Sequence, residues 1–491
     1  MLDRTDLVSQ LKDASLLTDK AFVGGEWTGA EGGRSFPVIN PARGDTLVSV
    51  PDLGEAEISR AINIAHDAQK DWARKTGKER AAVLRRWYEL MTANADDLAA
   101  ILTAEMGKPL AEAKGEIFYG ASFIEWYAEE AKRVYGETIP GHHPDRRLIV
   151  IKQPIGVAAS ITPWNFPNAM IARKVAPALA AGCAMVARPA SETPLSALAM
   201  AVLAERAGVP KGVFSVVTST SSSEVGKLFC SHPKVRKLTF TGSTEVGRIL
   251  LAQAADQVMK CSMELGGNAP FIVFDDADLD AAAEGAMTSK YRNNGQTCVC
   301  ANRIYVQEGV YDAFAEKLAA RAASLKVGDG FEEGVDTGPL INGAAVEKVE
   351  AHIADALAKG ARLVTGGKRH ALGGSFFEPT VLADVTPAMQ VTREETFGPV
   401  APLFRFRDEE DVIAQANDTI FGLASYFYAR DLGRVWRVAE ALEYGMVGIN
   451  TGLISTEGAP FGGVKQSGLG REGSRHGIDE YLEMKYLCLG I

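Results

Sequence analysis

The sequence predicts an α/β protein built from two parallel-sheet domains. Its 491 residues are too many for one hydrophobic core, because single domains usually hold about 100–200 residues. Short apolar runs alternate with helical segments from Ile155 to Lys260, and a second such pattern begins after Gly267 and continues to Ile449. This alternation is typical of parallel sheets that are covered by helices on both faces.

The N-terminal part is expected to hold a β entry segment followed by three long helices. Glycine and proline separate short strands between residues 22 and 50. Apolar residues at helical spacing predict helices over 55–74, 77–103 and 109–134. Because large rings dominate helix packing, we expect the aromatic side chains of these helices in the core: Trp72, Trp87, Tyr88, Phe118, Trp126 and Tyr127.

The alternating region is expected to contain regular strands and helices. Helices are predicted between and after the strands, among them 278–293 and 310–325, and the strands themselves are predicted over 157–161, 184–187, 213–217, 237–240, 269–274 and 303–306. The segment 136–147 is rich in Pro, Gly and His and indicates a turn, and 148–161 reads as extended. The apolar segment 481–491 reads as a strand that needs a partner.

Composition favours an enzyme that acts on small molecules. The formal net charge is −10, which offers no electrostatic footprint for nucleic acid. The six cysteines lack framework spacing and the N-terminus lacks an apolar signal core, so we expect a reduced, cytoplasmic protein. No apolar run approaches the roughly 18 residues of a membrane span. The seven histidines show no ligand spacing, so we expect no metal site.

A cysteine in the Gly/Asn-rich loop 293–300 is the candidate nucleophile. Cys298 follows a helical run and sits where backbone donors surround the sulfur, although a buried packing role is the alternative for any free cysteine. Two distant segments favour the catalytic interpretation. Glu264, next to Gly266-Gly267, supplies a carboxylate, and Asn165, in a Trp-Asn-Phe-Pro context, supplies an amide.

Five ordered motifs resemble those of the aldehyde dehydrogenase superfamily. They are residues 163–167, 240–247, 264–267, 295–298 and 395–399, and the resemblance runs from about Phe22 to the C-terminus. Within the superfamily the chain most resembles succinate-semialdehyde dehydrogenases, through the segments 171–174, 291–293, 298–300 and 452–455.

The resemblance implies a domain plan. A Rossmann-like cofactor domain is expected over 1–135 and 156–264, and a second α/β catalytic domain over 265–450. A β oligomerisation arm is expected over 136–155 and 470–491, with the C-terminal strand pairing with another subunit. The expected assembly is a homo-oligomer, either a dimer or a tetramer.

The cofactor site cannot be assigned from Gly-x-Gly-x-x-Gly, which is absent. Instead a strand runs into Thr241-Gly242-Ser243 and a helix that carries Gly247, so backbone N–H groups at the helix start are placed to receive a phosphate. The resemblance puts pyrophosphate at Gly242 and Ser243 and the nicotinamide ribose at Glu395 and Phe397. It also implies a cofactor wall formed by Thr162, Pro163, Trp164, Asn165 and Leu265.

NADP is the expected cofactor, with NAD as the alternative. An NAD-selective site would offer a carboxylate to the adenosine ribose, whereas this chain offers Arg188 and Ser191. A guanidinium can bind a 2′-phosphate bidentately, and a serine leaves that phosphate unrepelled. The alternative is that Arg188 is a solvated charge, and the neighbouring Glu192 weakens the case for NADP.

The implied chemistry is aldehyde oxidation through a covalent thiol adduct. Cys298 would add to the carbonyl, and after hydride transfer the thioester would be hydrolysed by water that Glu264 activates. Asn165 and the Cys298 backbone N–H would stabilise the oxyanion, at about 3–4 kcal/mol for one such donor. Alternatives from other classes are a thiol esterase and a non-catalytic structural protein on this fold.

An aldehyde with a terminal carboxylate requires positive charge opposite the thiol. By family position this comes from Arg173 and Arg292, with the hydroxyl of Ser455. Succinate and glutarate semialdehydes differ by one methylene, worth only about 1–3 kcal/mol, so glutarate semialdehyde or another ω-carboxylated aldehyde is the alternative substrate. The resemblance also suggests a reversible disulfide between Cys298 and Cys300, for which the alternative is that Cys300 is a packing residue.

Overall fold

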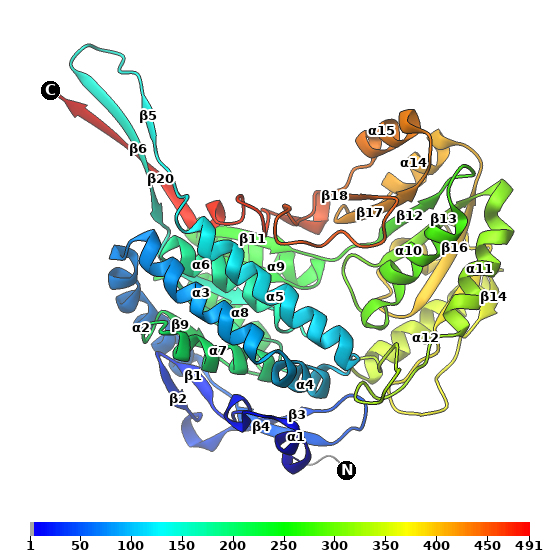
Figure 1. Cartoon of the computed structure of the whole chain (residues 1–491), viewed down its shortest axis with the longest axis horizontal. Coiled ribbons are helices and arrows are strands. Elements are labelled where there is room, and N and C mark those ends of the chain that lie inside the picture. Colours follow the sequence, from blue (N-terminus) through cyan, green and yellow to red (C-terminus); the bar gives the residue numbers. More distant parts are fainter. Residues whose placement is uncertain (1–3) are drawn as a thin grey trace.

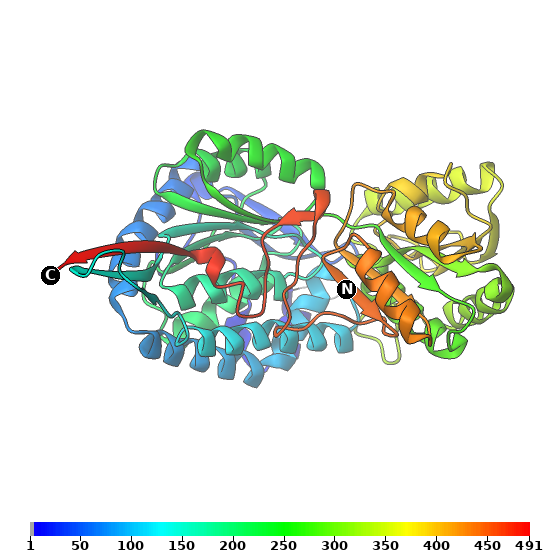
Figure 2. The ribbon, with the colours of Figure 1, turned by 90° about the horizontal axis from the view of Figure 1, so that it is seen from above.

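The computed structural model describes residues 4–491, which form two α/β bodies and a projecting β ribbon (Figure 1). The ribbon leaves the first body on the side away from the second body, as Figure 2 also shows. The helices are α1 (Arg4–Gln10), α2 (Glu55–Arg74), α3 (Gly77–Ala93), α4 (Ala95–Met106), α5 (Leu110–Glu130), α6 (Ala169–Ala181), α7 (Leu195–Ala207), α8 (Ser222–Ser231), α9 (Thr244–Ala254), α10 (Leu279–Tyr291), α11 (Tyr311–Ala323), α12 (Gly343–Ala358), α13 (Gln390–Arg393), α14 (Glu409–Asn417) and α15 (Leu432–Ala441).

The first body is built around an eight-stranded sheet. Its five central strands are parallel, and its edge strands are antiparallel. In spatial order the strands are β19 (Gly468–Leu469), β11 (Lys260–Glu264), β10 (Val235–Thr241), β7 (Val157–Ile161), β8 (Ala184–Arg188), β9 (Phe214–Val216), β1 (Ala21–Val23) and β2 (Glu26–Thr28). The expected parallel sheet is therefore present, and β3 (Ser35–Ile39) with β4 (Thr46–Pro51) forms a separate hairpin.

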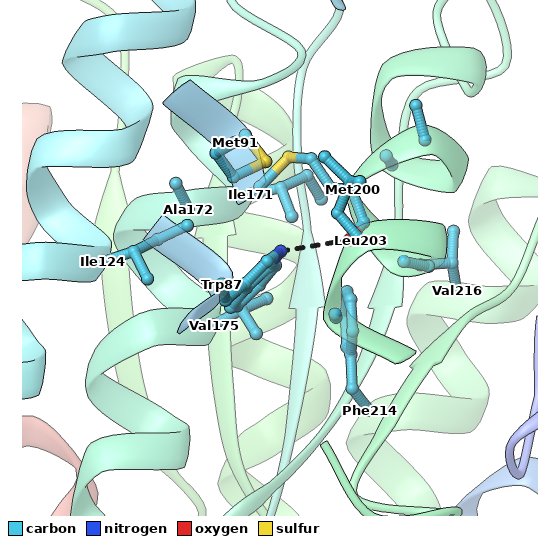
Figure 3. Packing of buried hydrophobic residues seen from close by; sticks show 14 of the residues in the cluster. Trp87, Met91, Ile124, Ile171, Ala172, Val175, Met200, Leu203, Phe214 and Val216 are labelled. Atoms are coloured by element: carbon cyan, nitrogen blue, oxygen red, sulfur yellow. Dashed lines mark hydrogen bonds between the residues drawn. The ribbon is translucent and has the colours of Figure 1, made fainter. Parts of the chain in front are cut away.

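Both faces of this sheet are buried, because apolar side chains point alternately to each side of its strands. Ala158 and Met185 pack with α3 to α7, whereas Val157 and Val186 pack with α2, α8 and α9. Figure 3 shows the first of these cores around Trp87, whose indole Nε1 donates to the Met200 carbonyl at 3.2 Å. A buried indole keeps a hydrogen-bond partner in this way.

The second body contains a seven-stranded sheet that is parallel except for its edge strand β14. Helices α10 and α11 pack on one face, and α12, α14 and α15 pack on the other. In spatial order the strands are β14 (Arg362–Thr365), β15 (Thr380–Ala383), β16 (Val400–Phe406), β13 (Ala301–Gln307), β12 (Ala269–Val273), β17 (Ala424–Tyr428) and β18 (Met446–Ile449). After β18 the chain crosses back, and β19 joins the first sheet (Figure 2).

The ribbon is an antiparallel sheet of β5 (Glu137–Ile139), β6 (Arg146–Pro154) and β20 (Leu482–Gly490). The C-terminal strand β20 lies at the edge of this sheet, and the expectation that it also pairs with another subunit stays a prediction. β20 pairs with β6 of its own chain, and the two nine-residue strands match along their whole length. Of the segment 470–491 that was expected to form part of the arm, only β20 belongs to the ribbon.

Two local expectations were wrong. The helix predicted over 77–103 is two helices, because the chain breaks at Asn94, whose Nδ2 donates to the Leu90 carbonyl at 2.8 Å. A side-chain amide that binds a backbone carbonyl competes with the helix in this way. Phe118 lies on the outer face of α5 and is 47% exposed rather than in the core. No helix within residues 4–491 is long and apolar enough to cross a bilayer.

Candidate active site

Two cavities meet at the Cys298 side chain, between the first and second bodies. Cavity A, of about 560 Å³, is lined by residues that include Glu112, Tyr119, Phe166, Met170, Arg173, Arg292, Cys298, Ser455 and Phe461. Cavity B, of about 410 Å³, is lined by residues that include Pro163, Trp164, Asn165, Gly242, Ser243, Glu264, Leu265, Cys298, Glu395 and Phe397. Cys298 therefore contributes to the walls of both cavities.

The loop that carries Cys298 is held in an unusual backbone conformation. After α10 ends, Asn293, Asn294 and Gly295 have φ of 52°, 54° and 75°. Asparagine tolerates this left-handed region better than most residues. A Cβ on Gly295 would lie 2.1 Å from the Gly398 carbonyl oxygen, and one on Gly267 would lie 2.4 Å from the Cys298 carbonyl oxygen. Only glycine fits at these two contacts, so the thiol loop is tightly enclosed.

Asn165 lies directly against this loop. Its side-chain nitrogen donates to the Gln296 carbonyl at 2.9 Å, and the Asn293 amide donates to the Asn165 carbonyl at 3.0 Å. The side-chain nitrogen of Asn165 carries a second N–H, because a primary amide has two donors. The predicted amide and the predicted thiol are therefore brought together across the two bodies.

Glu264 is the last residue of β11 and is buried at the wall of cavity B. Its Oε2 has no hydrogen-bond partner in the described structure. Burial raises the pKa of Glu264 well above its usual value, and the charge of Glu472 raises it further, whereas Arg173 and Lys174 act in the opposite direction. Glu264 therefore holds its proton more tightly than an exposed carboxyl group.

Burial also raises the pKa of the Cys298 thiol to about 12, with a smaller contribution of the same sign from Glu395. Arg173 opposes this shift. The raised pKa disfavours the thiolate, so formation of the nucleophile requires a proton acceptor.

Cavity A contains all three residues expected to hold a substrate carboxylate: Arg173, Arg292 and Ser455. The Arg173 guanidinium is paired with the buried Glu472 carboxylate at 2.7 Å and lies 3.9 Å from the centre of the Phe461 ring. The Arg292 guanidinium lies 5.2 Å from the centre of the Phe166 ring.

Lys174 pairs with the second oxygen of the same carboxylate, Glu472. Its ammonium group binds the Glu472 carboxylate and also donates to the Thr241 hydroxyl at 2.7 Å. Sequence reasoning missed Glu472, because it lies 298 residues from Lys174 and carries no local motif.

Cavity B is formed where β10 runs into α9. A Cβ on Gly242 would lie 2.4 Å from the Phe240 ring, and one on Gly247 would lie 2.5 Å from Leu265. The absence of side chains at Gly242 and Gly247 leaves room for Phe240 and Leu265 at the start of α9. Ser243 caps the helix, since its hydroxyl accepts from the Val246 N–H at 3.4 Å. The start of α9 thus presents the backbone N–H groups that suit an anion.

The far wall of cavity B comes from the second body. Phe397, at a φ of 57°, packs edge-on against Trp164 with ring centres 5.5 Å apart. Glu395 accepts from the Gly267 N–H at 3.1 Å, and burial raises the pKa of Glu395 to about 7. These residues and the start of α9 enclose a space suited to a dinucleotide.

Three residues of the expected cofactor site are not among those that line cavity B. Thr162 is buried, and its N–H donates to the Arg188 carbonyl at 3.2 Å. The Arg188 guanidinium donates to the Ser219 carbonyl at 2.8 Å and to the Ser222 hydroxyl at 2.6 Å. Ser191 lines a neighbouring cavity that shares Ile341 and Asn342 with cavity B.

Cys300 is buried, and its thiol donates to the Lys290 carbonyl at 3.6 Å. All six cysteines are free thiols in the structure. Within residues 4–491, no cluster of three or more His, Cys, Asp or Glu residues is placed to hold a metal ion.

Comparisons with known proteins agree with this geometry. The model of the aldehyde dehydrogenase family matches residues 27–487. The chain belongs to the aldehyde dehydrogenase family. It is 68% identical to a glutarate-semialdehyde dehydrogenase of Pseudomonas aeruginosa, with 98% of this chain and 99% of the relative covered.

Two other similar proteins carry a different substrate name. A succinate-semialdehyde dehydrogenase [NADP(+)] of Escherichia coli is 65% identical, with 98% of this chain and all of the relative covered. The crystal structure of a succinate-semialdehyde dehydrogenase from Burkholderia pseudomallei is 67% identical, with a TM-score of 0.97 over 98% of this chain and 100% of that chain. This aldehyde dehydrogenase therefore has close relatives named for substrates of two lengths.

Proposed function

We propose that the protein oxidises succinate semialdehyde to succinate with NADP. The observation that carries the proposal is the position of Cys298, which lines both cavities. Cavity A contains two arginines, and cavity B contains the start of α9 with Gly242 and Gly247. A carboxylate-bearing aldehyde would enter cavity A, and the bound cofactor would accept a hydride in cavity B.

The residues at the junction fit successive steps. Cys298 adds to the aldehyde carbon, and the second N–H of the Asn165 amide, with the Cys298 N–H, stabilises the oxyanion. Loss of a hydride from this adduct to the cofactor would leave a Cys298 thioester, and Glu264 then takes a proton from the water that hydrolyses it. Its buried position supports this role, because a raised pKa makes a carboxylate a stronger base.

Glutarate semialdehyde is the second candidate substrate, and the relative at 68% identity supports it. Arg292 and Ser455 supply the charge and the hydroxyl that a terminal carboxylate of either aldehyde needs. One methylene changes binding by about 1–3 kcal/mol, so a shared pocket would accept both with different kcat/KM values.

The preference for NADP rests on Ser191 and Arg188. Ser191 carries no charge that would repel a 2′-phosphate, whereas the Glu192 carboxylate, 3.1 Å from the Ser191 hydroxyl, opposes the preference. Arg188 lies close by in the chain, although its guanidinium already binds Ser219 and Ser222. The relative from Escherichia coli, whose name includes NADP(+), supports the same preference.

We further propose a cytoplasmic homo-oligomer, a dimer or a tetramer, that assembles through the ribbon. Free cysteines fit a reducing compartment. The ribbon exposes apolar side chains that a partner would cover, among them Met484, Tyr486 and Leu489. We also propose that the expected cofactor domain (1–135 and 156–264), catalytic domain (265–450) and arm (136–155 and 470–491) are the functional units of each subunit. Sedimentation velocity measures the oligomeric state, and a monomer at micromolar concentration would contradict it.

A steady-state screen of aldehydes against NAD and NADP tests the function. Succinate or glutarate semialdehyde with NADP should give the highest kcat/KM, and Cys298→Ala should be inactive while it still binds NADPH. A higher kcat/KM with an uncharged aldehyde would contradict the substrate proposal. Cofactor-independent ester hydrolysis without any aldehyde oxidation would favour a thiol esterase instead.

A further inference from the structure

Two carboxylates on one face of α5 each bind a different catalytic loop. Glu116 Oε1 accepts from the backbone N–H groups of Asn168 and Ala169, at 2.9 and 3.1 Å, where the Asn165 loop enters α6. Glu112 accepts from the N–H of Asn293, at 3.2 Å on Oε1 and 3.0 Å on Oε2, in the Cys298 loop. Residues four apart on a helix share a face, so α5 faces both loops at once.

The two loops belong to different bodies of the molecule. The Asn165 loop follows β7 of the first sheet, and the Cys298 loop precedes β13 of the second sheet. Helix α5 belongs to the core of the first body. The contact of Glu112 with Asn293 therefore joins the nucleophile loop to a rigid helix of the opposite body.

Glu116 is itself firmly held. Its Oε2 accepts from the buried Lys108 ammonium at 2.6 Å, and Lys108 also donates to the Asn165 carbonyl at 2.8 Å. The Lys108 side chain is buried, and so is that of Glu116. Glu116 thus fixes the Asn165 loop relative to α5. Glu112 fixes the Cys298 loop relative to the same helix.

Asn293 needs such a partner because of its backbone. It is the first of the three consecutive residues with positive φ, and such conformations persist only where the surroundings stabilise them. Hydrogen bonds from N–H groups to a carboxylate are stronger than those to a neutral acceptor. Glu112 supplies both of its oxygens to this one N–H.

We propose that Glu112 is a positioning residue that holds the Cys298 loop in register with Asn165. The inference rests on the proposed function of Cys298 and Asn165, and it adds a residue outside the reacting set. A loop displaced by about 1 Å costs on the order of 100-fold in rate. Removal of the Glu112 carboxylate should therefore lower kcat.

The test compares Glu112→Ala and Glu112→Gln with wild type and with Glu125→Ala. Glu125 lies on the same helix and pairs at the surface with Arg85, at 2.6 Å, so it is a matched control. The kcat is measured per active site, titrated by the binding of NADPH, with succinate semialdehyde and with butanal. The titration counts folded sites, so that a misfolded fraction does not mimic a catalytic loss.

Glu112→Ala should lose about 100-fold in kcat with both aldehydes and keep its KM for NADP. Glu112→Gln retains an acceptor oxygen and should recover most of that loss, and Glu125→Ala should match wild type. Butanal has no carboxylate and so does not depend on Arg292. A change in Arg292 caused by the loss of the Glu112 charge would therefore alter only the KM of succinate semialdehyde.

Three outcomes would overturn the proposal. They are a kcat of Glu112→Ala within about twofold of wild type, a loss confined to the KM of succinate semialdehyde, and a Glu112→Gln variant as impaired as Glu112→Ala. The ratio of each variant's kcat to the kcat of wild type is also measured with whichever aldehyde wild type oxidises fastest. A wild type inactive on semialdehydes would therefore contradict the proposed substrate and not the role of Glu112.

Discussion

The guanidinium of Arg173 lies 2.7 Å from the carboxylate of Glu472, and both side chains are buried. One of the two arginines expected to bind the substrate carboxylate therefore already has a counter-charge. Arg292, whose guanidinium packs near the Phe166 ring in the same cavity, is the stronger candidate for the substrate contact.

Arg292→Gln should raise the KM for succinate semialdehyde far more than the KM for butanal. A hydrogen bond to a charged group contributes about 1.5–3 kcal/mol, which corresponds to about 10–100-fold. Arg173→Gln should instead lower activity on both aldehydes. It removes the positive charge that opposes Glu472, so the pKa of Glu264 should rise further. Steady-state kinetics on the two aldehydes give this comparison, and equal losses on both for Arg292→Gln would make Arg292 structural.

The rate of thioester hydrolysis should increase with pH as Glu264 loses its proton. Burial raises the pKa of Glu264, and the base form is the one that activates water. Glu472→Gln removes a neighbouring negative charge, so the pKa of Glu264 should fall and the rise in activity should move to lower pH. The pH profile of kcat measures this shift, and a shift to higher pH would contradict it.

Ser191→Glu should move the cofactor preference toward NAD by at least about tenfold in the ratio of kcat/KM values. A carboxylate at this position repels the 2′-phosphate and accepts hydrogen bonds from the ribose hydroxyls. Ser191→Gln, of similar size and without charge, is the matched control. An unchanged ratio in Ser191→Glu would remove Ser191 from the cofactor site.

Peroxide should inactivate the enzyme reversibly through a Cys298–Cys300 disulfide. The Cys300 thiol faces the Lys290 carbonyl, so the loop has to move before the two sulfurs meet. Wild type should lose two mass units and recover with a thiol reductant, whereas Cys300→Ala should gain oxygen and recover poorly. Gain of oxygen by wild type would show that Cys300 has no redox role.

Much of the fold could be predicted because periodic apolar patterns determine it. The helix predicted over 55–74 is α2 at the same bounds, and the strand predicted over 157–161 is β7. The break at Asn94 was missed because a side-chain amide that binds a nearby carbonyl leaves the apolar period unchanged. The pairing of β20 with β6 was not predicted, because strand pairing over more than 300 residues has no local signal.

The candidate site also has residues that could be predicted from the sequence and residues that could not. Cys298, Glu264 and Asn165 stand in short motifs, and the structure brings Cys298 and its neighbours together at one junction. Glu112 and Glu472 stand in ordinary helical or loop sequence, and their partners lie 181 and 298 residues away in the chain. Only the packing of the two bodies shows what these carboxylates contact.

The most direct test of the central claim is the intact mass of Glu264→Gln after mixing with succinate semialdehyde and NADP. The variant forms the thioester but lacks the base that hydrolyses it, so the chain should gain one succinyl group at Cys298. One NADPH should form per active site, and turnover should then stop. An unmodified chain with normal steady-state turnover would contradict the assignment of Glu264 as the base that hydrolyses the thioester.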